Sequence, residues 1–535
     1  MEFELEPPPP SQISSGARPT RGIDVLGVRL PVQDVGAELL DGVTTVTQTI
    51  RYLGLRAWTA RRYALARLPN AWGPFSEFAG RVEAAVAIGN LLVDPGTPGL
   101  IGSDRAFPVA SSGAETFDLE KLVAQTAAAI YAGASEQLLL TYSDGEAVPG
   151  LSPERGLPLY QAIDATLGCS TVGRELARDP QARNFSRDAL AEVGQIYSMR
   201  AVGGREGEAL LAALLPGDPL PREISRMGSY ALILELALRH TRSPTKSDVF
   251  ASAVARDADL PTYYGPWLDG WARYLVRDML AVVHEAVLAA VTGELEARAQ
   301  SGAMDGAAII RSLLSRADEF DEPLTALGLL PKGTPAQSWS VRDLANSLSE
   351  AQGETTDGPI RRWSGTIDEE AIIRCALSAG AGALSLAPLA WLMARSRIGQ
   401  PSAKGLGARG MSRSGETRLG IVQVVLPGVK SLLEGRATLY KAANELAWQT
   451  VQQHLSIAWA RLAADPRLDV ACMSTDGSRW SLRRSFIQGR TGARLTRAIA
   501  WTEQLGLIDS SGCTELGRRV LDRLRTQLSV AKVAS

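Results

Sequence analysis

The strongest constraint on the fold of this chain is a long stretch of helical periodicity near its centre. Arg222–His240 and Tyr263–Arg298 place apolar residues at three- and four-residue steps, the spacing that keeps side chains on one face of an α-helix. Trp267, Trp271 and Tyr274 follow one another along the second segment at this spacing. Large aromatic side chains in such a stripe are typical of core packing. The pattern predicts a mainly α protein with a multi-domain helical body.

The length of 535 residues suggests about three domains. Composition shifts and turn signals give the following expected segments: a disordered tail at 1–22, an N-terminal helical domain at 23–220, a central helical domain at 221–400, a flexible Gly/Arg-rich loop at 401–418, and a helical pair with a C-terminal module at 419–535.

The net charge and the positions of the cysteines and histidines exclude several functional classes. The net charge of -2 gives no global bias toward nucleic acid, so such binding would need local patches. The four cysteines include no closely spaced pair, which excludes zinc fingers and ribbons, and the three histidines are scattered along the chain. We therefore expect reduced thiols, no cofactor and no metal site.

The sequence indicates a cytoplasmic chain without a membrane span. Met1–Pro10 lacks the basic start and apolar stretch of a signal peptide. Cys375–Ala394 is the longest uncharged candidate, but glycines, serines and Pro388 interrupt it. We interpret it as core helices.

The C-terminal module has the clearest local signals. Leu468–Met473 and Trp480–Leu482 are predicted to pair across the Asp476–Gly477 turn. Thr491–Leu505 follows as a helix that ends at Gly506, and a short hairpin leads to a last helix capped by Thr514. This order resembles the winged helix-turn-helix, in which the helix before the wing often enters the DNA major groove.

Arginines concentrate in and before that helix, and guanidinium groups suit phosphates and guanine edges. The candidate nucleic-acid-binding residues are Arg479, Arg483, Arg484, Arg490, Arg494 and Arg497. The alternative is a protein-docking module whose arginines lie on a solvated face. A weaker pattern of the same kind spans 118–168, where a helix over Asp118–Ala132 precedes a strand and a turn.

An arginine–aromatic helix near the N-terminus gives a second candidate surface. Ile50–Leu68 has one apolar stripe, and Thr44 or Thr45 is expected to cap it. Arg51, Trp58 and Arg62 share a flank that could stack on bases. The alternative is that the aromatic residues pack in the core while the arginines pair with carboxylates.

This N-terminal run also resembles a motif of uncharacterised bacterial proteins encoded near restriction and anti-phage genes. The matching residues are Gly42, Thr44, Thr47, Arg51, Tyr52 and Trp58. Those proteins are described as helical, and some end in a winged helix. The resemblance implies a role in a defence system but no particular biochemical activity.

A motif typical of dinucleotide-binding enzymes is present, but it lacks the flanking elements that such enzymes require. Gly405–Gly410 matches GxGxxG, yet no strand precedes it and no acidic residue follows at the required distance. A divergent metal-dependent nuclease remains an alternative, with Asp318, Asp321 and Glu369 as ligands. These acids also suit solvated helix ends.

The sequence therefore predicts a non-catalytic nucleic-acid-binding or scaffold subunit of a bacterial multi-protein system, consistent with anti-phage defence. DNA is the expected ligand of the C-terminal module. A protein partner would supply ATPase or nuclease activity. The alternatives are the nuclease above and a winged-helix transcriptional regulator.

Overall fold

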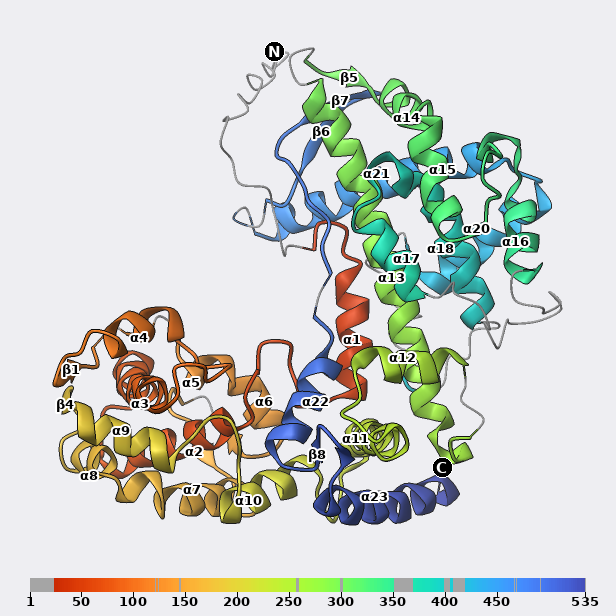
Figure 1. The fold of residues 1–535 in the computed structure, drawn as a ribbon. Coiled ribbons are helices and arrows are strands. Elements are labelled where there is room, and N and C mark those ends of the chain that lie inside the picture. Colours follow the sequence, from red (N-terminus) through yellow and green to blue (C-terminus); the bar gives the residue numbers. More distant parts are fainter. Residues whose placement is uncertain are drawn as a thin grey trace. The chain divides into compact units, whose positions relative to one another are not determined.

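The computed structural model confirms the prediction of a mainly helical chain (Figure 1). It describes residues 24–120, 122–123, 125–143, 146–255, 259–298, 302–350, 369–398, 405–407, 419–465, 467, 469–490 and 492–534. The predicted tail at 1–22 and most of the predicted loop at 401–418 lie outside these residues. In the described part of the chain, no helix is both long and apolar enough to cross a membrane.

The chain divides into two units, and each combines segments that are distant in the sequence. Unit 1 contains residues 1–35 and 250–491, and unit 2 contains 36–249 and 492–535. The boundaries pass through α1 (Arg29–Leu39) and α12 (Lys246–Ala255). The segment predicted as one C-terminal module is therefore divided, with its first hairpin in unit 1 and its helices in unit 2.

Unit 1 is built around the 33-residue helix α13 (Gly265–Ala297), shown in green in Figure 1. The other helices of unit 1 are α14 (Gly306–Leu314), α15 (Ala317–Ala326), α16 (Val341–Glu350), α17 (Glu369–Ala376), α18 (Ala383–Ile398), α20 (Leu426–Glu434) and α21 (Leu439–Ala464). Helices α17 and α18 pack directly on α13. Trp271 and Tyr274 are buried on α13, which confirms the predicted core stripe.

A small antiparallel sheet completes unit 1. Its strand order is β5 (Met304–Asp305), β7 (Arg479–Leu482) and β6 (Met473–Asp476), with Met304 opposite Trp480. The turn between β6 and β7 contains Gly477, whose φ of 57° is in the left-handed region that glycine tolerates. The predicted hairpin is thus confirmed, although its first strand begins at Met473 rather than Leu468.

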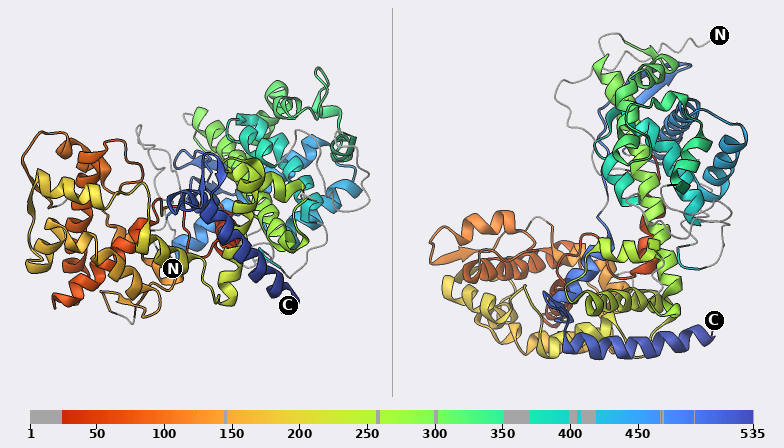
Figure 2. Two further views of the ribbon diagram at one scale, coloured as in Figure 1. Left: turned by 60° about the horizontal axis from the view of Figure 1, so that its bottom comes forward. Right: turned by 45° about the vertical axis from the view of Figure 1, so that its right-hand side comes forward.

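Unit 2 combines residues 36–249 with the end of the chain. Its helices are α2 (Arg51–Leu65), α3 (Trp72–Val93), α4 (Ser103–Ala110), α5 (Ala127–Ile130), α6 (Ala132–Gln137), α7 (Gly156–Asp164), α8 (Thr171–Arg178), α9 (Arg187–Ile196), α10 (Gly204–Leu214), α11 (Pro221–His240), α22 (Arg494–Gln504) and α23 (Glu515–Ala534). Helix α23, in dark blue, packs against the yellow-green α11, as the right view of Figure 2 shows.

Among the described residues, unit 2 also has three short antiparallel strand pairs. Two are hairpins, which pair β2 (Thr141–Tyr142) with β3 (Gly150–Leu151) and β8 (Ile508–Asp509) with β9 (Gly512–Cys513). The third pairs β1 (Thr116–Asp118) with β4 (Asn184–Ser186), which are distant in the sequence. The β8–β9 hairpin lies between α22 and α23, as predicted. Gly506 ends α22 with a φ of 67°, and the Thr514 hydroxyl accepts the Gly517 N–H at 3.0 Å.

Two local predictions in unit 2 are wrong. The expected helix over Asp118–Ala132 begins only at Ala127, because residues 116–118 pair with β4 and Leu119 N–H continues that pairing by donating to Arg183 O. Tertiary pairing here overrides helix propensity. Neither Thr44 nor Thr45 caps α2, since its N-cap is Ile50, without a side-chain cap.

Candidate functional site

Two acidic residues on α13 form the centre of a buried charge network in unit 1. Asp278 and Glu285 are seven residues apart, or about two helical turns, so they lie on the same face. Their relative exposures are 0% and 4%. Buried carboxylates require charged or hydrogen-bonding partners, and two arginines from distant segments supply them.

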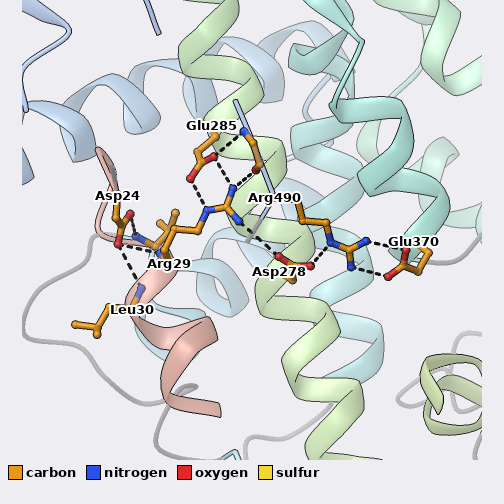
Figure 3. Close-up of polar contacts among 9 residues, drawn as sticks. Asp24, Arg29, Leu30, Asp278, Glu285, Glu370 and Arg490 are labelled. Carbon is orange, nitrogen blue, oxygen red and sulfur yellow. Dashed lines mark hydrogen bonds and ion pairs between the residues drawn. The ribbon is translucent and has the colours of Figure 1, made fainter. Parts of the chain in front are cut away.

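The first arginine belongs to the start of α1. Arg29 donates from Nε and Nη2 to the two carboxylate oxygens of Glu285, each at 2.6 Å, and its Nη1 lies 3.7 Å from Asp278 (Figure 3). The Asp24 carboxylate accepts the N–H groups of Val28, Arg29 and Leu30, at 3.0 to 3.3 Å. Local capping therefore positions Arg29 toward α13.

The second arginine is Arg490, which the sequence predicted as a nucleic-acid contact. Its Nε donates to Asp278 at 2.6 Å, and Nη1 and Nη2 donate to the two oxygens of Glu370 at 2.8 and 2.5 Å (Figure 3). Arg29 also donates to the carbonyl of Gly489. The network thus joins α1, α13, α17 and the segment that follows β7.

Burial and pairing act in opposite directions on the ionisation of this network. Burial raises the pKa of Asp278, and Arg490 and Arg29 offset part of this effect. Burial likewise raises the pKa of Glu285 against the opposing effect of Arg29. For Arg490, burial alone would lower the pKa, but hydrogen bonds to Glu370 and the charge of Asp278 raise it. The charged form of Arg490 is therefore favoured, and it lies between the two carboxylates of Asp278 and Glu370.

In unit 2, helix α22 contacts the loop Val43–Ile50, here named the threonine loop. Arg494 Nη1 donates to Val43 O at 2.6 Å, and Arg497 Nε donates to Thr45 O at 3.0 Å. Trp501 Nε1 donates to Thr47 O at 3.1 Å. The structure thus brings together two motifs that are distant in the sequence, because these arginines bind the run that precedes α2.

The arginine–aromatic flank of α2 also engages its own unit. Arg51 has a relative exposure of 7%, and its guanidinium makes a paired contact with Glu206 and lies 3.8 Å from the centre of the Tyr197 ring. Trp58 is 1% exposed and donates from Nε1 to Asp164 at 2.9 Å. Arg62 pairs with the same Asp164 carboxylate. Of the two interpretations left open, this geometry matches core packing with carboxylate pairing.

The three remaining predicted arginines belong to unit 1 and face neighbouring backbone or acid groups. Arg479 is exposed and donates from Nη2 to Ala303 O at 2.7 Å. Arg483 and Arg484 both pair with Asp469, at 2.9 and 3.5 Å. These three arginines therefore belong to a different unit from Arg494 and Arg497, which are part of unit 2.

The acids of the nuclease alternative do not converge. Asp318 and Asp321 line an open cavity of about 610 Å³ beside α15, together with Lys332. Glu369 instead pairs with Arg397 at 2.6 Å, and both side chains are buried. Within the described residues, no group of three or more His, Cys, Asp or Glu side chains is arranged to hold a metal ion.

Sequence reasoning missed the acidic half of these contacts, namely Asp278, Glu285, Glu370 and Glu206. One signal was available, since Asp278 and Glu285 interrupt the apolar periodicity of a predicted core helix at a seven-residue spacing. Acids inside a buried stripe imply charged partners.

Comparison with known proteins adds no further assignment, because no family model, curated protein or solved structure matches this chain.

Proposed function

We propose that this chain is a scaffold subunit of a multi-protein system and that a partner protein supplies the chemistry. The observation that carries the proposal is the placement of Arg490 between Asp278 and Glu370, at 2.6 and 2.5 Å. An arginine used in this way serves the chain's own structure. The bacterial defence context comes only from the resemblance of the N-terminal motif.

Buried charge networks support this role through specificity rather than through net stability. Replacing such a network with apolar residues is often neutral, whereas removing one partner costs several kcal/mol. A network that joins four segments therefore selects one arrangement of α1, α13, α17 and residues 489–490. A defined arrangement of this kind suits a subunit that presents fixed surfaces to a partner.

A second candidate function is DNA contact through a winged-helix-like C-terminal part. The order α22, β8, β9, α23 favours it, because the short hairpin lies where a wing would lie. Arg494 and Arg497 of α22 are half-buried, so part of each side chain is open to a ligand. A DNA-binding function predicts duplex affinity that falls steeply between 50 and 200 mM salt.

The test of the scaffold proposal is reconstitution with defined partners. The full chain is co-expressed with the products of its neighbouring genes, and the stoichiometry and ATPase or nuclease activity of any complex are measured. A complex of fixed stoichiometry whose activity resides in the partner supports the proposal. A chain that forms no such complex but binds duplex DNA with a steep salt dependence would favour the second candidate.

A further inference from the structure

Helix α21 exposes an apolar stripe that its own unit leaves open. Trp459 is 75% exposed, the largest exposure among the large apolar side chains of the described residues. Trp448, Leu455 and Leu462 are half-buried, and at about 100° per residue all four lie on one face of the helix. Trp448 packs edge-on against the buried Trp480, with ring centres 4.7 Å apart.

The stripe lies on a segment without formal charge. Residues 446–460 contain no Asp, Glu, Lys or Arg, and the single histidine, His454, is buried. Depletion of charge around an exposed tryptophan is typical of the centre of an interface. The stripe therefore has the composition of a surface that another segment covers.

The first described residues of the chain form hydrogen bonds and an ion pair with this same helix. His454 Nε2 accepts the Cys472 N–H at 3.0 Å, so its Nδ1 carries the hydrogen and donates to Val25 O at 3.0 Å. Gln453 Nε2 donates to Leu26 O at 2.7 Å, and Arg461 lies 3.9 Å from the Asp24 carboxylate. The point at which residues 1–23 join the described chain is therefore held beside α21.

The segment between Pro10 and Asp24 is long enough for Pro7–Pro10 to reach the stripe. Trp459 lies five residues beyond His454, which is about 7.5 Å along the axis of a helix about 10 Å wide. The 13 residues between Pro10 and Asp24 can span about 45 Å when extended. Even a path around the helix is within this reach.

The composition of the tethered segment fits the stripe. Pro7–Pro10 is an uninterrupted proline run, preceded by Phe3 and Leu5. Proline runs favour the polyproline II conformation, which is already ordered and binds to surfaces lined by aromatic side chains. Tethering adds a high effective concentration, so even a weak contact would be occupied.

We infer that the segment containing Pro7–Pro10 docks on the α21 stripe, with the proline rings against Trp459. The stripe is then an intramolecular docking site, and a partner protein that needs the same surface must displace the segment.

Photo-crosslinking in the full-length purified chain tests this inference. Trp459 is replaced by p-benzoylphenylalanine, and the crosslinked peptides are mapped by mass spectrometry. We expect intrachain crosslinks to the segment around Pro7–Pro10, and their loss when all four prolines are changed to serine. Leu377, which is 39% exposed in the same unit, gives the matched control position and should not crosslink to this segment. Crosslinks from position 459 to a second copy, or none to the segment, would overturn the inference.

A second experiment tests the docking of the N-terminal segment without introducing the bulky crosslinker at position 459. Trypsin cleavage after Arg21 is followed by release of the N-terminal peptide. We expect Trp459→Ala to accelerate this release at least threefold and Leu377→Ala to leave it unchanged. An equal rate in Trp459→Ala and the parent chain would contradict docking. Neither result depends on the scaffold proposal, which is tested by partner reconstitution.

Discussion

The α13 network of unit 1 and the threonine-loop junction of unit 2 use arginines in two different ways. Arg490 neutralises two buried carboxylates, whereas Arg494 and Arg497 donate to backbone carbonyls. Removing Arg490 leaves buried carboxylate charges without their cation. Removing Arg494 or Arg497 leaves only a backbone carbonyl without that hydrogen-bond donor. The same residue type at neighbouring sequence positions therefore has very different energetic importance.

The largest expected effect is the loss of Arg490. Arg490→Ala leaves Asp278 and Glu370 without their shared cation, and the side chains of these two acids are 1% and 11% exposed. We expect a loss of about 3–5 kcal/mol in the free energy of unfolding, measured by urea denaturation. Arg479→Ala is the control, because this exposed side chain contacts a carbonyl, and it should cost under about 1 kcal/mol. Equal losses of unfolding free energy in Arg490→Ala and Arg479→Ala would contradict the special importance of the buried arginine.

A smaller effect concerns a buried acid in unit 2 that backbone hydrogen bonds hold in place. Glu83 accepts the N–H groups of Ala127 and Ala128, at 2.6 and 3.1 Å. Burial raises its pKa to about 8, against the opposing effect of these two hydrogen bonds. The folded chain therefore holds this proton more firmly than the unfolded chain. Stability should fall as the pH rises from the ordinary carboxyl pKa toward 8.

Glu83→Gln should remove that part of the pH dependence, because the amide does not ionise. Between pH 6 and pH 9 the parent chain should lose on the order of 1–3 kcal/mol more than the variant, as measured by thermal unfolding at the two values. Glu77→Gln, on the exposed side of the same helix, should behave like the parent. A parallel pH dependence in parent and Glu83→Gln would show that Glu83 contributes nothing to it.

The smallest effect is expected at the threonine loop. Arg494→Ala and Arg497→Ala each remove a hydrogen bond to a carbonyl at a half-buried position, so each should cost about 1–2 kcal/mol in unfolding free energy. Thr496→Ala, exposed between them on α22, should be close to neutral. Wild-type stability combined with a large loss of duplex DNA affinity in both arginine variants would favour the DNA-binding candidate instead.

The sequence predicted the elements of the fold better than their assembly. The stripe on α13 and the short hairpin after α22 follow from local periodicity and turn residues, so both were predictable. The helix expected over Asp118–Ala132 was wrong because pairing with β4, more than 60 residues away, decides the conformation of its first residues. The interleaving of segments in each unit is likewise non-local and leaves no local signal.

The candidate site shows the same division. Sequence alone identified the arginines, because they cluster near the C-terminal end, but it assigned them all to one surface. The structure distributes them between units and gives them different acceptors, since Glu370 and Val43 are far from them in the sequence. Only Asp278 and Glu285, the acidic positions on α13, indicated from the sequence that buried acids would need charged partners.

A double-mutant cycle between Arg490 and Glu370 tests most directly whether Arg490 serves the chain's own architecture. Unfolding free energies are measured for the parent, Arg490→Ala, Glu370→Ala and the double variant. The contacts at 2.5 and 2.8 Å predict a coupling of about 1.5–3 kcal/mol, so that the double variant is less destabilised than the sum of the single variants. Additivity within about 0.5 kcal/mol would contradict this role.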